Sequence, residues 1–149
     1  MIKLSLQEKL HNEIPMTKLM GLKINEYNAK ELITSAPLEI NVNDKGTAFG
    51  GSLNSIVTIS GWSMCQLIAY ELGYEKSAIM IYKNSSEFKA PVHSRIMCHV
   101  QKPSEEKIDT LKRKLQNKHS GSLTVYAQII EKGKVCVEFE GIYIIKVKP

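Results

Sequence analysis

Residues 41–73 read NVNDKGTAFGGSLNSIVTISGWSMCQLIAYELG, and this stretch decides the fold. Its first part, 41–51, is a polar loop that ends in Gly50-Gly51. Its second part, 52–72, has no proline and only one charged residue, Glu71. The apolar residues of 52–72 fall on nearly all sides of a helical wheel, which is typical of a helix buried in a protein core. Such a helix would span about 31 Å, the width of a small domain.

Length and composition indicate a single globular domain over residues 1–149. The chain is 43% hydrophobic and 23% charged, which is ordinary for a folded protein with a sizeable core. The longest apolar run is broken by Ser, Thr and Gln and is not expected to span a membrane. The start, MIKLSLQEKL, lacks the apolar segment of a signal peptide. We therefore expect a cytoplasmic protein.

The cysteines and the net charge indicate the state of the thiols and the kind of partner to expect. Cys65, Cys98 and Cys136 are widely spaced and form no CxxC pair, so we expect free, mostly buried thiols. The formal charge of +5 favours an acidic partner, which could be a nucleotide-bearing cofactor, an acidic carrier protein or a nucleic acid. The alternative is a mildly basic protein that binds no acidic partner, because the net charge alone does not distinguish the two.

The rest of the chain alternates between strand and helix patterns. Ser5–Glu8 fits a capping box that opens a first helix, and 103–106 opens a later one that Gly121 ends. The predicted strands are 22–27, 31–40, 76–88, 92–100, 123–130 and 135–147, the last two joined by a hairpin turn over 131–134. This order predicts an α+β domain, a mostly antiparallel sheet of about six strands around the central helix. Strand 135–147 is expected at an edge, where it needs a covering layer or a partner.

The order of elements and the loop sequence resemble the hotdog fold. Residues 43–51, NDKGTAFGG, look like the N-x-x-G-x-x-H-G-G motif of the phenylacetate-pathway type of hotdog thioesterases. Asn43, Gly46, Gly50 and Gly51 match that motif, and Phe49 stands where it has histidine. A closer resemblance, over nearly the whole chain, is to the YiiD C-terminal-domain family of thioesterases. It rests on the segments IPMTKLMG, APLEINVNDKGTAFGGSL, Gly61-Trp62 and APV at 90–92.

This resemblance implies a function and an assembly. The implied reaction is hydrolysis of an acyl thioester of coenzyme A or of acyl carrier protein, with coenzyme A present only as part of the substrate and no other cofactor. The implied assembly is a homodimer or a dimer of dimers, in which two sheets join edge to edge and the active sites lie at the subunit interface. Neither a nucleic acid nor a membrane is an expected partner.

Thioester hydrolysis needs a polarised carbonyl and an activated water. Backbone N–H groups near Gly51 and Ser52 would face the developing oxyanion at the positive end of the helix. The alternative is that Gly50-Gly51 only permits a tight turn. The helix position that carries an acid in the phenylacetate-type enzymes is Thr58 here, which could hold a water but cannot be a base.

By elimination, the predicted base is Asp44, the acid of the loop, with Asn43 positioning the water. Glu87, on the third predicted strand, is the reserve base, because Glu71 lies about 30 Å from Gly51 along the helix. Turn-forming roles are the alternatives for Asp44 and Asn43. The expected substrate contacts are Lys45, Gly46, Phe49, Gly50, Ser55 and Glu87.

Other chemistries are less well supported by the residue pattern. No set of His, Cys and Asp has metal-ligand spacing, so no metal is predicted. His93 and His99 share a predicted strand face with Arg95, which favours surface or interface roles. The basic run 112–114 could meet the phosphates of coenzyme A, but a solvated helix face is the commoner reading.

Two other functions stay open beside hydrolysis. One is hydration or dehydration of an acyl thioester, which usually needs a histidine paired with an acid, and Phe49 replaces the histidine that would serve. The other is a non-catalytic protein that binds or senses acyl thioesters, which the loss of the helix acid at Thr58 keeps open. Turnover of acyl-CoA substrates distinguishes the thioesterase from the binding protein.

Overall fold

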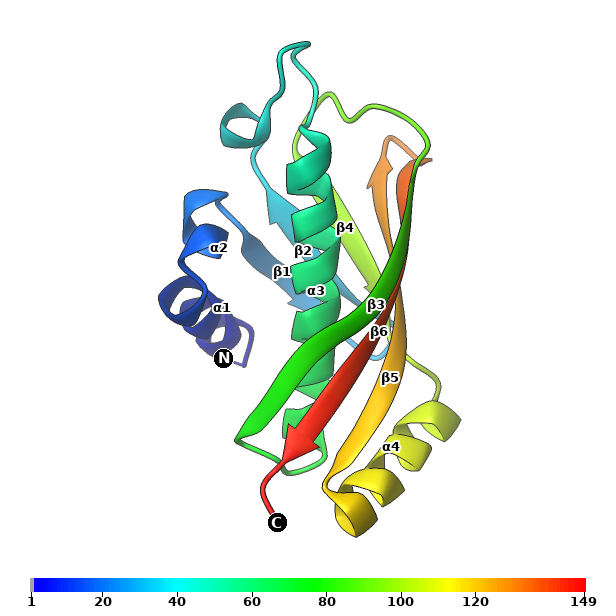
Figure 1. Ribbon diagram of the computed structural model, residues 1–149. Coiled ribbons are helices and arrows are strands. Elements are labelled where there is room, and N and C mark those ends of the chain that lie inside the picture. The colour runs from blue at the N-terminus through cyan, green and yellow to red at the C-terminus, as the bar shows by residue number, and fades with distance from the viewer. Residues whose placement is uncertain (1) are drawn as a thin grey trace.

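The computed structural model describes residues 2–149 (Figure 1). Within them the chain forms six strands, four α-helices and one 3₁₀ helix. In chain order these are α1 (Ile2–Glu13), α2 (Pro15–Leu19), β1 (Lys23–Tyr27), β2 (Glu31–Ala36), η1 (Glu39–Asn41), α3 (Gly50–Glu71), β3 (Ser77–Phe88), β4 (Ile96–Gln101), α4 (Glu105–Lys118), β5 (Ser120–Glu131) and β6 (Lys134–Val147).

The six strands form one antiparallel sheet in the order β1-β2-β4-β5-β6-β3. The long helix α3 runs across one face of this sheet, with α1 and α2 beside it, and α4 packs against β5 (Figure 1). We call the face that α3 covers the helix face and the opposite one the outer face. The predicted antiparallel sheet of six strands around a central helix is confirmed.

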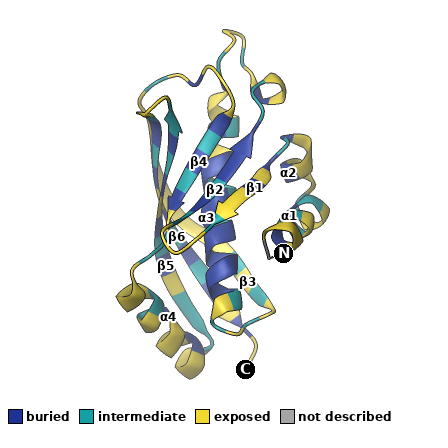
Figure 2. Cartoon of the chain, turned by 180° about the vertical axis from the view of Figure 1, so that it is seen from behind, coloured by how far each residue is buried: buried dark blue, intermediate teal, exposed yellow. Residues whose placement is uncertain are grey.

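Side chains of α3 and of the strands on the helix face make the core, as the dark band in Figure 2 shows. Tyr143 of β6 is fully buried there, and its hydroxyl donates to the backbone oxygen of Thr58 at 2.6 Å. Gly61 makes this approach possible, because a Cβ at that position would overlap the Tyr143 ring. Trp62 lies half-buried beside β3, where its indole N–H donates to the backbone oxygen of Ile79 at 3.0 Å.

The prediction that strand 135–147 lies at an edge is wrong. The matching strand β6 pairs with β5 on one side and with β3 on the other, so it is interior to the sheet. The edges are β1 and β3, and β3 is the longer of the two at 12 residues. A long alternation of apolar and polar residues shows that one face of a strand is buried. It does not show whether the strand pairs with a neighbour on both of its edges.

Several predicted boundaries also need correction. The capping box at Ser5–Glu8 lies inside α1, which begins at Ile2. Strand β2 ends at Ala36 because Pro37 cannot donate to a ladder, and β4 begins only at Ile96. Helix α4 ends before His119, which adopts the left-handed conformation (φ 60°), so the predicted stop at Gly121 is two residues late.

Candidate active site at the start of α3

The loop 42–49 is a small hairpin closed by an antiparallel bridge between Val42 and Ala48. Asn43 makes hydrogen bonds within this hairpin. Its side-chain oxygen accepts from the backbone N–H of Lys45 at 2.8 Å and from that of Thr47 at 3.1 Å. The Asn43 amide nitrogen also donates to the Thr47 hydroxyl at 2.9 Å. The side chain of Asn43 is therefore turned into the loop, and its second amide hydrogen is what is left for a substrate or a water.

The tip of this hairpin carries the predicted base. The Asp44 carboxylate lies 3.2 Å from the Lys45 ammonium, and the two side chains are 83% and 76% exposed. Gly46 follows with φ at +80°, a conformation that glycine adopts without strain. Asp44 and Lys45 thus make a solvent-exposed ion pair, which is a weak contact that either partner can leave.

The base of the hairpin is anchored on both sides. The N–H of Ala48 donates to the backbone oxygen of Val92 at 2.8 Å, and the N–H of Phe49 donates to that of Asn41 at 2.7 Å. Asn41 is itself buried, and its side chain donates to the backbone oxygens of Met20 and Pro37. These bonds fix where the helix α3 begins relative to the loop.

Helix α3 starts at Gly50 without a side-chain cap. Its N-cap residue is Phe49, which has no capping oxygen, so no side chain caps the helix. The first amide with a partner is that of Leu53, which donates to the backbone oxygen of Phe49 at 3.0 Å. Within residues 2–149 the amides of 50–52 have no acceptor. Gly50 and Gly51 are exposed, so these donors are available to a ligand.

An aromatic side chain covers part of this helix start. The Phe49 ring packs directly over Gly51, where a Cβ would overlap the ring. The same ring is 54% exposed to solvent, so it also presents apolar surface beside the free amides. Phe49 therefore replaces the motif histidine with an apolar wall, not with another proton donor.

The first turns of α3 carry a polar side that faces β3. Ser86 of β3 donates to the side-chain oxygen of Asn54 at 3.2 Å, and both Asn54 and Ser55 are exposed. Thr58, one turn on, donates its hydroxyl proton to the backbone oxygen of Asn54 at 2.7 Å. Thr58 can therefore accept a hydrogen bond from a water, but it cannot act as a base.

The reserve base, Glu87, lies on the face of the sheet opposite the start of α3. Ser86 points to the helix face, where it meets Asn54, so its neighbour Glu87 points to the outer face. There it stands opposite Glu138 in the β3–β6 register. The sheet thus separates Glu87 from the helix start, a placement that the sequence did not predict because the register of β3 was unknown.

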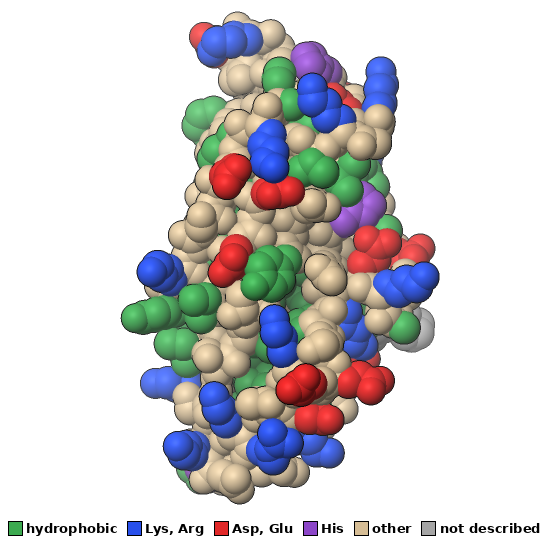
Figure 3. Space-filling model, turned by 90° about the vertical axis from the view of Figure 1, so that its right-hand side faces the viewer, with side chains coloured by type: hydrophobic (Ala, Val, Ile, Leu, Met, Phe, Trp, Pro, Cys, Tyr) green, Lys and Arg blue, Asp and Glu red, His purple; other side chains and the backbone are tan. Residues whose placement is uncertain are grey.

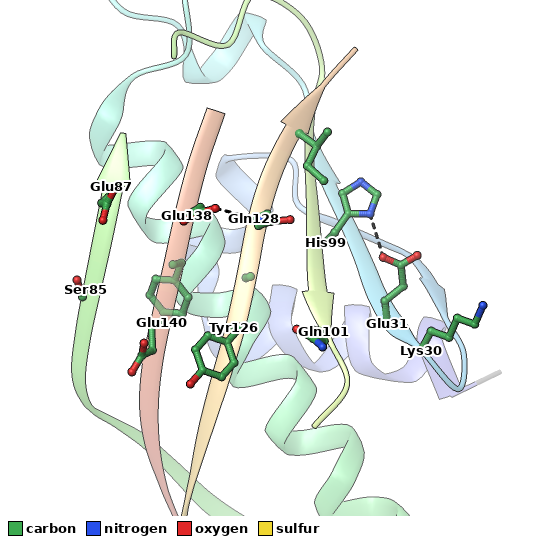
Figure 4. Close-up of a pocket in the computed structure, with 13 residues that line it drawn as sticks. Lys30, Glu31, Ser85, Glu87, His99, Gln101, Tyr126, Gln128, Glu138 and Glu140 are labelled. Carbon is green, nitrogen blue, oxygen red and sulfur yellow. Dashed lines mark hydrogen bonds and ion pairs between the residues drawn. The ribbon is translucent and has the colours of Figure 1, made fainter. Parts of the chain in front are cut away.

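The outer face has a hollow of its own, of about 620 Å³, which Figure 4 shows. Carboxylates of Glu31, Glu87, Glu138 and Glu140 line it, together with the rings of His99 and Tyr126. His99 pairs with Glu31 at 3.1 Å, and Gln128 donates to Glu138 at 3.3 Å. This hollow lies across the sheet from the free amides of α3 and is not part of the candidate active site.

Residues 2–149 also bear on metal binding, membrane insertion and thiol chemistry. Among these residues, no three His, Cys, Asp or Glu side chains lie close enough together to hold a metal ion. None of the helices in this part of the chain is both long and apolar enough to cross a membrane. Cys65, Cys98 and Cys136 are all free and buried, and burial raises the pKa of each thiol. A buried thiol with a raised pKa is a poor nucleophile.

The family model described as putative thioesterase (yiiD_Cterm) matches residues 3–147. The chain belongs to this family. The match confirms the resemblance carried by the 36–53 segment and by Gly61-Trp62.

Solved structures of similar proteins agree with this membership. A protein of unknown function from Chlorobaculum tepidum TLS is 30% identical, with a TM-score of 0.92 over 99% of this chain and 95% of that one. A putative thioesterase from Shewanella oneidensis is 28% identical, with a TM-score of 0.88 over 98% and 97% of the two chains. A thioesterase from Haemophilus influenzae is 11% identical, with a TM-score of 0.71 over 97% of this chain and 90% of that one, and shares the fold. The fold of this YiiD C-terminal-family chain is the hotdog fold.

Proposed function

We propose that this member of the YiiD C-terminal family hydrolyses acyl thioesters of coenzyme A or of acyl carrier protein. The observation that carries the proposal is the start of α3, where the unpartnered amides of 50–52 open to solvent beside the Phe49 ring. Free amides at a helix N-terminus stabilise negative charge on an oxygen. An aromatic wall next to them suits the apolar part of an acyl thioester.

The proposed step uses water as the nucleophile. The oxygen of water adds to the thioester carbonyl carbon, and the carbonyl oxygen takes the negative charge while it accepts from the amides of Gly51 and Ser52. The C–S bond then breaks, the carbonyl re-forms as a carboxylic acid, and the sulfur leaves as a thiolate. The proton that the base takes from water passes to the thiolate, so that acid and thiol are the products.

Asp44 is our proposed base, because it is the one acid in the loop that precedes α3. Its carboxylate is exposed and is held only by the Lys45 ammonium. Moving it from the hairpin tip toward a bound substrate therefore costs little free energy. Asn43 shapes the hairpin and keeps one amide hydrogen for the attacking water. Thr58 would accept from that water, and Ser55, Lys45 and Gly46 would border the substrate.

We further propose a homodimer that forms through the edge strand β3. Its outer edge is unpaired within residues 2–149, and an unpaired edge of this length invites pairing with another chain. Met80, Ile81 and Tyr82 are 42%, 38% and 69% exposed along it, an apolar content that an edge facing water does not favour. Pairing β3 with a partner's β3 would also cover the polar side of α3 at Asn54 and Ser55.

The function is tested by turnover. The purified chain is assayed against acyl-CoAs of graded chain length and against acyl carrier proteins bearing the same acyl groups, with release of free thiol as the readout. Thiol release with a preference for one chain length supports the proposal. Tight binding of acyl-CoA without thiol release from any substrate would refute hydrolysis and leave the non-catalytic binding protein.

A further inference from the structure

The segment 89–95, which joins β3 to β4, supports the hairpin 42–49 from one side. It crosses the upper end of the molecule between the β5–β6 turn and that hairpin (Figure 1). The Val92 side chain is buried, and the Val92 backbone oxygen accepts from the N–H of Ala48 at 2.8 Å. Ala48 lies two residues before Gly50, where α3 begins. The position of Val92 therefore helps to set where the free amides of 50–52 lie.

Glu131, the last residue of β5, holds this segment directly after Val92. Its Oε1 accepts from the backbone N–H of His93 at 2.9 Å and from the Ser94 hydroxyl. Its Oε2 lies 3.3 Å from Nδ1 of the His93 ring. Figure 3 shows a histidine at the surface of this upper end, near acidic and basic side chains. Three contacts to one carboxylate thus fix two consecutive residues of a connection that is neither helix nor strand.

The surroundings of the Glu131 carboxylate suit this role. The Glu131 side chain is 13% exposed, while that of His93 is 64% exposed. The hydrogen bond from the Ser94 hydroxyl lowers the pKa of Glu131 most, burial opposes this effect, and the bonds from His93 lower the pKa further. The carboxylate is therefore charged at neutral pH, and hydrogen bonds to a charged acceptor are stronger than those between neutral groups.

Glu131 itself stands on a rigid part of the sheet. The two residues that follow it, Lys132 and Gly133, form a two-residue turn with φ at 49° and 76°. Positive φ at both positions is typical of the tight type I′ hairpin. Beyond that turn, the backbone oxygen of Cys136 accepts from the N–H of Lys89 at 2.7 Å, at the start of the segment. The β5–β6 hairpin thus holds the segment both at its beginning and in its middle.

We infer that Glu131 is a positioning residue for the candidate active site. It fixes 93–94, Val92 in turn fixes Ala48, and the amides of 50–52 stay where a thioester carbonyl would develop its negative charge. Oxyanion donors act only when they are correctly placed, and a misplacement of about 1 Å can cost about 10²-fold in rate. The kinetic part of this inference rests on the proposed hydrolysis, whereas the anchoring of the hairpin does not.

Three variants separate this role from a general effect on stability. Glu131→Ala removes all three contacts, whereas Glu131→Gln keeps an Oε1 that can accept from His93 and Ser94. The matched control is Glu31→Ala, which removes a pair of the same kind, the 3.1 Å contact between Glu31 and His99 on the same sheet (Figure 4). In the described part of the chain, the Glu31 carboxylate makes no hydrogen bond to the segment that Glu131 holds. Thermal melts should show that all three variants stay folded at the assay temperature.

Amide hydrogen exchange, followed residue by residue by NMR, measures the anchor without any turnover. In Glu131→Ala the Ala48 amide should exchange about tenfold faster or more, because its acceptor Val92 is no longer held. The Phe49 amide should change less, since Asn41 holds it from the other side. The chemical shifts of the free amides at the start of α3 should move in Glu131→Ala and stay close to wild type in Glu131→Gln and in the control.

The same variants are then assayed for thiol release from acyl-CoA. Glu131→Ala should lower kcat by about 10–10²-fold with KM within about twofold, because displaced amides lose contact with the transition state more than with the bound substrate. Glu131→Gln should recover most of this loss, and Glu31→Ala should keep the wild-type kcat. A role confined to stability would lower the melting temperature and leave kcat unchanged.

The remaining outcomes each overturn the inference or the proposed function. If Ala48 exchanges at the wild-type rate in Glu131→Ala, Glu131 does not anchor the hairpin. If exchange and shifts change but kcat does not, the anchor does not position the reaction. If Glu31→Ala gives the same changes, a loss of overall stability explains them. If the wild type releases no thiol, hydrolysis is refuted, and the Ala48 exchange and the free-amide shifts still decide whether Glu131 sets the start of α3.

Discussion

The two halves of α3 differ in what they contribute to the molecule. In the first two turns, Gly50, Gly51, Asn54 and Ser55 are exposed, and the amides at the very start have no partner. From Ser60 to Ala69 nearly every residue is buried against the sheet, and Gly61 lets the Tyr143 ring touch the helix backbone. One half thus anchors the fold, while the other leaves polar backbone available for a ligand. Substitutions in the first half should change activity, and substitutions in the second half should change stability.

The largest expected effect is on catalysis, at the loop that leads into the first half. Asp44→Asn keeps the shape of the side chain and removes its charge, so kcat should fall by about 10²–10⁴-fold while the melting temperature stays unchanged. Asp109→Asn, an exposed position on α4, is the matched control and should retain full turnover. Full turnover by the Asp44 variant would remove Asp44 from the mechanism. Loss of turnover in Glu87→Gln would then indicate action across the proposed dimer, because Glu87 faces away from α3 of its own chain.

A second prediction concerns packing in the buried half. Trp62→Ala removes a half-buried ring and its hydrogen bond to Ile79, and should lower the free energy of unfolding by about 3 kcal/mol, the low end for such a truncation. Trp62→Phe keeps most of the packing and loses only the N–H donor, so it should cost about 1 kcal/mol. Denaturant unfolding of both variants measures the difference. Equal losses would mean that the hydrogen bond, not the ring, holds β3 to α3.

A glycine pair compares the two halves directly. Gly61→Ala forces a methyl group into the Tyr143 ring and should cost about 1–3 kcal/mol of stability. Gly50→Ala adds the same methyl group where no atom lies within 4 Å, so its effect on unfolding should stay within about 0.5 kcal/mol. Thermal melts of the two variants should therefore separate clearly. Similar melting temperatures would show that the core relaxes around position 61.

The last expected effect is on pH dependence, and it is absent at neutral pH. Burial raises the pKa of Cys98 from 9.0 to about 11, although the hydroxyls of Ser60 and Thr34 act in the opposite direction. A thiol whose pKa is higher in the folded state stabilises it at low pH and loses that contribution as pH rises through the folded pKa. Stability should thus fall between about pH 9 and pH 11, and the fall should be shallower in Cys98→Ala. Identical slopes would assign the alkaline loss to other buried groups.

Much of the fold was predictable from local pattern. The long apolar run without proline predicted α3 to within two residues at each end, and alternation with a turn over 131–134 predicted the β5–β6 hairpin. The loop motif and Gly61-Trp62 were enough to identify the family. These features are local in the chain, so periodicity and spacing reveal them.

Within the candidate site, the sequence indicated the loop and the helix start but missed the contact between Asn54 and Ser86. A signal was present, since Gly51, Asn54, Ser55 and Thr58 form a polar stripe at helical spacing on an otherwise apolar helix. What that stripe faces depends on the register of β3, which is set by its pairing with β6 and not by its own residues.

The sequence by itself determined that a buried helix lies inside an antiparallel sheet, because the spacing of apolar residues shows which faces of each element are buried. Only the tertiary structure decided which strand lies at the edge and that Glu87 points away from α3. Those outcomes depend on pairings between residues distant in the chain. A shift of one residue in such a pairing would turn every side chain of the strand to the other face.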